Sequence, residues 1–292
     1  MHAINQYRQG DLNAPALLSS RLAADGIYLV TFSQGNANLQ EQYVMFEHLR
    51  ERVTVRQIIL PVVFDDTRED GLREEVAVMA RDANLRARLM RDDYGRQLLE
   101  HQHAKISETD AVALNSPQYR TESWLDEKLD QNVPVWHARP QMRGDFFVGL
   151  YRLRNTVFGI TPSTKRKKIL SRYTENIGAL EAILKSSHAA GIDVLVYIAP
   201  VGIDHGQRPY VESEYAQFKS DVQALAERHA ATYANLEDLI PEHLWGQKDS
   251  TGVKSAVEPD FMHFTSAGHM VLADRLEVLL KRGASAGGKR PQ

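Results

Sequence analysis

Apolar and polar residues follow one another along the chain with periods that predict strands and helices in turn. Residues 57–64 and 192–200 are short, mostly apolar runs, which are typical of strands buried on both faces of a parallel sheet. Residues 14–24, 39–49 and 213–229 place apolar side chains at helical spacing, with polar side chains between them. We therefore predict an α/β fold in which helices cover a parallel sheet.

Further segments complete the predicted core. Residues 27–32 are expected to form a strand near the N-terminus, and residues 233–236 a short strand near the C-terminus. An apolar helical pattern then closes the chain, and Thr265 or Ser266 is a natural N-cap for it. The residues just before this cap carry the strongest chemical signal in the sequence.

A long stretch between residues 67 and 170 is predicted to be an insertion. It exceeds the length of an ordinary connection, and much of it has a helical pattern, so we expect a mostly helical insertion with packing of its own. Arginines and aspartates are interleaved in its first part, which is typical of a solvated helix face. Residues 1–282 are otherwise expected to form one domain, and the Gly- and Ala-rich residues 283–292 a flexible tail.

Composition narrows the class of protein only in part. A chain of 292 residues with 43% hydrophobic content can bury a sizeable core, and a formal net charge of -3 gives no reason to expect a nucleic-acid partner. The absence of cysteine excludes disulfides and thiolate chemistry. No apolar run is long enough to span a bilayer, and no signal-peptide pattern opens the chain. The chain as written is expected to be soluble, with a cell-envelope location only if a signal or anchor precedes Met1.

The strongest chemical signal is the pair Asp260 and His263, three residues apart. A histidine takes a proton from a serine hydroxyl when a carboxylate on its Nδ1 atom fixes the tautomer and stabilises the imidazolium. One turn of chain can present both side chains to a shared cleft, so the pair predicts two members of a Ser-His-Asp triad. An isolated Asp-x-x-His is more often a capped turn beside a half-buried histidine, and the surrounding elements decide between the two interpretations.

The order of these elements resembles the C-terminal half of SGNH (GDSL) hydrolases. In that family a strand ending in Pro, a helix, a short strand and Asp-x-x-His follow one another, and here the strand ends at Pro200. Near the N-terminus, Gly35 matches the family's second block, and Asp65 matches the asparagine position of the third block, Gly-x-Asn-Asp. The resemblance implies a three-layer, flavodoxin-like parallel sheet, with Gly35 supplying an oxyanion-hole amide.

The sequence departs from the family in two places. An ionised carboxylate at Asp65 cannot donate to an oxyanion, so the site would need a protonated Asp65 or a substitute donor such as Asn36 or Asn38. The family's first block, a strand running into Gly-x-Ser, is not found ahead of the second. The nucleophile is then either a serine that precedes Met1, which we favour, or Ser33, which lies in the predicted strand-to-helix turn.

The resemblance implies a serine esterase or an O-acyltransferase acting on an acyl ester, with a cell-surface polysaccharide as a candidate substrate and a membrane-bound acyltransferase as a candidate partner. It implies no cofactor, and the histidine spacing and the lack of nucleotide-binding motifs predict neither a metal nor a nucleotide site. The two departures leave a second hypothesis open: a catalytically silent module that binds a glycan, an acyl chain or a protein partner. The basic run at residues 165–168 is expected to be solvated, with a phosphate or membrane contact as the lesser alternative.

Overall fold

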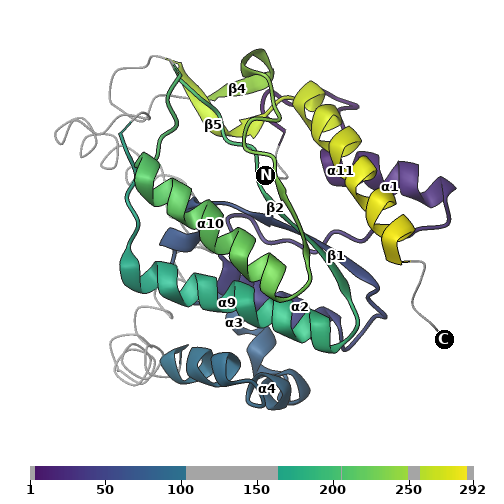
Figure 1. The fold of residues 1–292 in the computed structure, drawn as a ribbon, viewed down its shortest axis with the longest axis vertical. Coiled ribbons are helices and arrows are strands. Elements are labelled where there is room, and N and C mark those ends of the chain that lie inside the picture. The colour runs from purple at the N-terminus through teal and green to yellow at the C-terminus, as the bar shows by residue number, and fades with distance from the viewer. Residues whose placement is uncertain (1–3, 103–163, 205, 249–256, 288–292) are drawn as a thin grey trace, which may run out of the picture.

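A computed structural model describes residues 4–102, 164–204, 206–248 and 257–287 (Figure 1). Residues 103–163 of the predicted insertion and the end of the predicted tail lie outside these ranges. The α-helices with assigned bounds are α1 Ala14–Ala24, α2 Leu39–Leu49, α3 Glu74–Ala77, α4 Ala83–Leu89, α9 Leu170–Ala189, α10 Glu212–Arg228 and α11 Ser266–Gly287, and residues 93–102 are also helical. Short 3-10 helices are η1 Asp65–Arg68, η2 Met79–Arg81 and η3 Glu242–Leu244. The strands are β1 Gln57–Val62, β2 Asp193–Ile198, β3 Thr232–Asn235, β4 Trp245–Lys248 and β5 Glu258–Phe264.

A three-stranded parallel sheet forms the centre of the described fold, in the order β1-β2-β3. Leu60 of β1 pairs with Val196 of β2, and Tyr197 of β2 pairs with Ala234 of β3. The central strand β2 is buried along its length after Asp193. The strands predicted at residues 57–64 and 192–200 are therefore present, each slightly shorter than expected.

Helices cover both faces of this sheet. Val194, Val196 and Ile198 of β2 pack in one hydrophobic cluster with α2, α9 and α10. The intervening residues Leu195 and Tyr197 pack in a second cluster with α1 and α11. Figure 1 shows α9 and α10 on one side of β2, and α1 beside α11 on the other. Two buried faces explain why the strand is a continuous apolar run, and the predicted α/β class, a parallel sheet flanked by helices, is confirmed.

The prediction of a strand at residues 27–32 is wrong. This segment has no regular secondary structure and pairs with no strand in the described part of the chain, and Tyr28 and Val30 are 90% and 75% exposed. Its carbonyl at Leu29 accepts a hydrogen bond from the Ser19 hydroxyl (3.3 Å) instead of from a neighbouring strand. Local β-propensity does not make a strand without a partner backbone, which explains the error.

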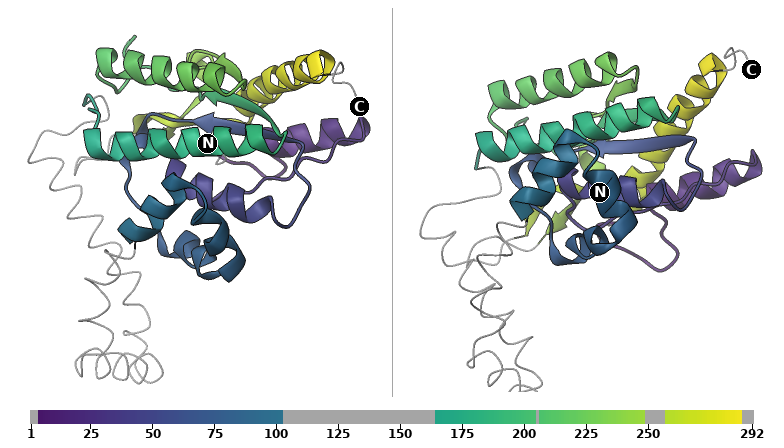
Figure 2. Two further views of the ribbon diagram at one scale, coloured as in Figure 1. Left: turned by 60° about the horizontal axis from the view of Figure 1, so that its bottom comes forward. Right: turned by 90° about the horizontal axis from the view of Figure 1, so that it is seen from below.

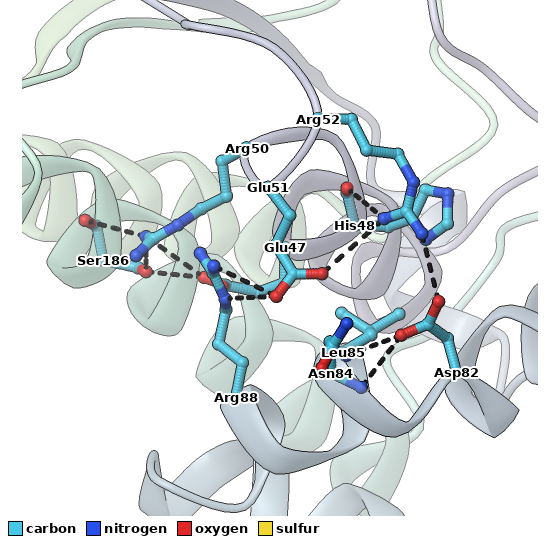
Figure 3. A network of polar contacts seen from close by, with 10 residues as sticks. All are labelled: Glu47, His48, Arg50, Glu51, Arg52, Asp82, Asn84, Leu85, Arg88 and Ser186. Atoms are coloured by element: carbon cyan, nitrogen blue, oxygen red, sulfur yellow. Dashed lines mark hydrogen bonds and ion pairs between the residues drawn. The ribbon is translucent and has the colours of Figure 1, made fainter.

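The first part of the predicted insertion packs against α2, where Figure 2 shows α3 and α4 on the side away from α11. A polar network joins α2, α4 and α9 (Figure 3). Glu47 accepts a hydrogen bond from the Ser186 hydroxyl (2.5 Å), and Arg88 forms an ion pair with Glu51 (3.0 Å). Burial raises the pKa of Glu47 despite these partners. The expectation of a solvated helix face therefore does not hold for Arg88.

The chain closes with α11, which begins at Ser266, so Thr265 takes the N-cap position. The helix runs to Gly287, and the tail expected from residue 283 therefore begins inside it. Within the described residues, none of the helices combines the length and the apolar character needed to cross a bilayer.

Candidate active site

The pair Asp260 and His263 lies in a bulge of the β4–β5 hairpin. Trp245 of β4 pairs with Phe264 of β5, and Gln247 pairs with Pro259. Gly246 alone therefore faces the four residues from Asp260 to His263, which leave the hydrogen-bonded ladder. The local structure that brings the pair together is a bulge within a strand, where the sequence predicted a turn.

The two side chains meet within this bulge. Asp260 Oδ2 lies 2.9 Å from His263 Nδ1, and Asp260 Oδ1 accepts from the backbone N–H groups of Met262 (2.9 Å) and His263 (3.1 Å). A carboxylate facing Nδ1 favours the tautomer with hydrogen on that atom, which leaves the lone pair of neutral His263 on Nε2. The arrangement can hold an imidazole so that Nε2 accepts a proton.

Burial and charge differ between the partners. Asp260 is only 6% exposed, whereas the His263 side chain is 39% exposed. Burial alone raises the pKa of Asp260, but hydrogen bonds from the His263 ring and the backbone N–H groups outweigh it, so the pKa lies below its ordinary value. Asp260 is therefore a carboxylate at neutral pH. Nε2 of His263 forms no hydrogen bond with any described residue.

The bulge packs against the carboxyl edge of the parallel sheet. Gly202, just after β2, donates its N–H to the carbonyl of Phe261 (2.9 Å). A Cβ atom at Gly202 would lie 2.9 Å from Phe261 Cα, so a side chain there would push the bulge away. The carboxyl ends of parallel strands are where open α/β sheets bind ligands.

Asp65, at the start of η1 just after β1, is linked to this bulge through the side chain of Tyr210. The Tyr210 hydroxyl donates to Asp65 Oδ2 (3.0 Å) and lies 3.9 Å from the sulfur of Met262. Arg166, from the basic run at residues 165–168, forms an ion pair with the same oxygen, and Arg68 lies 3.3 Å from Oδ1. Both oxygens of Asp65 thus face donors of neighbouring side chains and act as acceptors toward them.

The neighbouring Asp66 was not singled out by the sequence. Burial, together with the nearby carboxylates of Asp65 and Glu69, raises its pKa to about 8. A carboxyl group with this pKa is mostly protonated at neutral pH, so Asp66 has the hydrogen that a side-chain donor to an oxyanion would need. In the sequence, Asp66 is only the second of two acids after a predicted buried strand, and this position does not show whether its side chain is buried.

Three other predicted residues occupy the turn before α2. Ser33, Gly35 and Asn36 are all exposed, and no described hydrogen bond joins any of them to His263. Arg73 donates to the carbonyl of Gly35 (2.5 Å), which ties the turn to the start of the insertion. The predicted strand that would have presented Ser33 is absent.

Asn38, named as a substitute oxyanion donor, is engaged elsewhere. Its Oδ1 accepts from the N–H of Glu41 (2.9 Å), and its Nδ2 donates to the carbonyl of Gly71 (2.8 Å). The side chain of Glu41 in turn accepts from the Asn38 N–H (3.2 Å), which completes a capping box at the start of α2. Asn38 therefore fixes the start of a helix.

Asn5 is a site residue that the sequence gave no reason to choose. Its Nδ2 donates to Asp260 Oδ2 (2.9 Å), although the two residues are 255 positions apart. No spacing rule links positions so distant, so the contact is visible only in the fold.

Comparisons of the chain with protein-family models, with curated proteins and with solved structures found no match. What the chain does must therefore be inferred from its own side chains.

Two further groups of side chains have chemistry suited to binding. Ligand atoms of Asp70, His101 and Glu175 all lie within 4.8 Å of one another, so three separate elements bring together types of side chain that bind metals. Histidine spacing in the sequence could not show this. The two residues Asp70 and His101 are exposed, a common setting for such groups without an ion.

A surface pocket of about 480 Å³ opens between α2 and α4, where Figure 3 shows Arg52 and Arg88. It is lined by Glu51, Arg52, Asn84, Ala87, Arg88 and Arg91. Arg52 pairs with Asp82 (3.1 Å) and Arg88 with Glu51 (3.0 Å), so these two cations already have acidic partners. The pocket is built from elements that contribute nothing to the Asp260–His263 pair.

Proposed function

We propose that the chain is an SGNH-like serine esterase or O-acyltransferase domain, with His263 as the general base and Asp260 as the residue that orients it. The observation that carries the proposal is the 2.9 Å contact between Asp260 Oδ2 and His263 Nδ1, with the ring partly exposed. A buried carboxylate on Nδ1 and an accessible Nε2 are what acyl transfer through serine requires. The position of the pair at the carboxyl edge of a parallel sheet supports a three-layer, SGNH-like arrangement.

The proposed reaction proceeds through an acyl-enzyme. His263 Nε2 takes the proton of a serine hydroxyl as the serine oxygen bonds to the acyl carbonyl carbon. The resulting imidazolium is stabilised by Asp260 and returns the proton to the leaving alcohol oxygen as the ester bond breaks. Water, or a hydroxyl of an acceptor, then attacks the acyl-serine with the same assistance, which gives hydrolysis or transfer.

Ser33 is the candidate nucleophile within this chain. It lies in the exposed turn before α2, beside Gly35 and Asn36, which are the proposed oxyanion donors. No described hydrogen bond joins Ser33 to His263. The resemblance to SGNH hydrolases is the reason for proposing an acyl ester of a cell-surface polysaccharide as substrate and a membrane acyltransferase as partner.

The second candidate function is a catalytically silent module that binds a glycan, an acyl chain or a protein partner at the same edge of the sheet. One observation favours it: Asp65, at the position of the family's oxyanion-hole asparagine, accepts from Tyr210 (3.0 Å) and pairs with Arg166. The acceptor role leaves the oxyanion without the family's side-chain donor.

Reaction with a fluorophosphonate serine probe, followed by peptide mapping, tests the enzyme proposal. The variants are His263→Ala and Ser33→Ala, with His243→Ala as a matched control, because His243 is also a histidine near the hairpin and is exposed. Labelling at Ser33 that is lost in His263→Ala and kept in His243→Ala would make this chain a hydrolase with its own nucleophile. No labelling in any protein would contradict the enzyme proposal and favour the binding module.

A further inference from the structure

The N-terminal segment lies against the β4–β5 hairpin through Asn5. The backbone N–H of Asn5 donates to the carbonyl of Phe264 (3.1 Å). The backbone N–H of Gln247 donates to Asn5 Oδ1 (3.2 Å). Asn5 is thus held by both strands of the hairpin, on either side of the bulge that contains the Asp260–His263 pair.

These contacts fix the orientation of the Asn5 amide. Because Oδ1 accepts from Gln247, the NH₂ group faces Asp260 Oδ2, at 2.9 Å. A flipped amide would place its oxygen against the carboxylate and its NH₂ against a backbone donor, which would remove both hydrogen bonds. The Gln247 N–H therefore donates to Asn5, and Asn5 donates to Asp260 Oδ2, the oxygen that also contacts His263 Nδ1.

Asn5 supplies a hydrogen bond that the bulge cannot supply itself. Oδ1 of Asp260 accepts from the N–H groups of Met262 and His263, and Oδ2 accepts from His263 Nδ1 and from Asn5. The first three donors belong to the same short bulge as Asp260 and would move with it. Asn5 anchors the carboxylate to the hairpin as a whole.

Gly246 makes room for this contact. It is the residue of β4 that faces the bulge, and a Cβ atom there would lie 1.9 Å from Asn5 Cγ and 2.2 Å from Asn5 Oδ1. Such distances are far inside van der Waals contact, so any side chain at Gly246 would displace the Asn5 side chain. The glycine thus provides a second position at which the contact can be broken, without altering Asn5, Asp260 or His263.

We propose that Asn5 is a positioning residue that holds the Asp260 carboxylate in the plane in which it meets His263 Nδ1. The catalytic meaning of this role rests on the proposed function, whereas the contact and its effect on Asp260 do not. A carboxylate free to rotate would let the imidazole turn, and small misplacements of a base reduce turnover strongly.

The experiment is a ¹³C NMR titration of Asp260 in the full chain carrying carboxyl-labelled aspartate, with the signal assigned through Asp260→Asn. Asn5→Ala removes a donor to the charged form, so the pKa of Asp260 rises toward its ordinary value. Gly246→Ala produces the same direction of change. Asn5→Asp raises the pKa further, because a second carboxylate then faces the first.

The matched control is Asn13→Ala, which removes an asparagine whose side chain accepts from the Ala16 N–H (3.0 Å) at the start of α1. This variant loses a local hydrogen bond of the same kind but leaves the titration of Asp260 unchanged. An unchanged titration in both Asn5→Ala and Gly246→Ala would overturn the proposal. An equal change in Asn13→Ala would overturn it too, because general loosening would then explain the effect.

Turnover of an activated ester separates this inference from the proposed function. Where the wild-type protein turns over, Asn5→Ala lowers kcat about tenfold with KM nearly unchanged, because the loss falls on the base and not on binding. If the wild type has no turnover but Asp260 titrates as described, the positioning contact stands and the enzyme proposal fails. If turnover is present and Asn5→Ala keeps full kcat, Asn5 has no positioning role.

Discussion

Asp66 makes the stability of this protein depend on pH in an unusual direction. Its pKa is about 8 in the folded chain, raised chiefly by burial, against an ordinary value of 3.8. The folded state therefore holds a proton on Asp66 that the unfolded state releases at neutral pH. Replacing Asp66 with Asn keeps the size of the side chain and removes the titration.

The magnitude follows from the difference in pKa. Below the ordinary value of 3.8 the group is protonated in both states and has no effect on the free energy of unfolding. As the pH rises from 3.8 to about 8, stability falls, and the full penalty at alkaline pH is about 6 kcal/mol from about 1.4 kcal/mol per unit. Part of Asp66 remains accessible to solvent, so this figure is an upper bound.

Urea unfolding of the wild type and Asp66→Asn, at about pH 5 and about pH 8, measures the effect. The free energy of unfolding of Asp66→Asn, relative to that of the wild type, should be higher at the alkaline pH than at the acidic pH, by several kcal/mol at most. The adjacent Asp65→Asn is the contrasting control, because it leaves Arg166 without its ion-pair partner and should destabilise under both conditions. If Asp66→Asn and the wild type change in parallel with pH, Asp66 does not carry a buried proton.

Three further predictions concern the frame of the site. Asn38→Ala should lower the free energy of unfolding by about 1 to 2 kcal/mol in urea denaturation, because the capping box of α2 and the hydrogen bond to the Gly71 carbonyl (2.8 Å) are lost; an unchanged midpoint would contradict this. Gly202→Ala should destabilise by about 1 to 3 kcal/mol, since the new Cβ atom would meet Phe261 Cα at 2.9 Å, and amide exchange in β5 should accelerate; unaltered exchange would refute the close contact. Because folding lowers the pKa of Asp260, its carboxylate contributes to the free energy of unfolding at neutral pH, and this contribution is lost as the pH falls from 3.8 through the folded pKa. Asp260→Asn should therefore lower the free energy of unfolding at neutral pH and lower it less in acid, and an equal decrease under both conditions would argue against this reasoning.

The parts of the fold that could be predicted are those decided by nearby residues. The continuous apolar run of β2 reports two buried faces, and Asp260 and His263 meet because the bulge that joins them is local. The segment at residues 27–32 has the composition of a strand, but pairing depends on a distant backbone that no local pattern describes. Because this strand is absent, Ser33 does not lie in the strand-to-helix turn that the sequence predicted.

The rest of the site depends on contacts between remote positions. Asn5 meets Asp260 across 255 positions, and Gly246 matters only because the chain folds Asn5 onto it. The protonation of Asp66 depends on burial, which two adjacent acids in a sequence do not report. Geometry and solvent access, and not residue type, distinguish the roles of Asp65 and Asp66.

The central claim is that His263 activates a nucleophile by taking its proton, and acyl transfer from a p-nitrophenyl ester tests it most directly. With Ser33 as the nucleophile, the proposed mechanism predicts a burst of p-nitrophenol close to one equivalent of protein. The rate of this burst should fall by about 10⁴-fold in His263→Ala and should be unchanged in His243→Ala. The same rate in the wild type and His263→Ala would contradict the claim, because the imidazole beside Asp260 would then have no part in the chemistry.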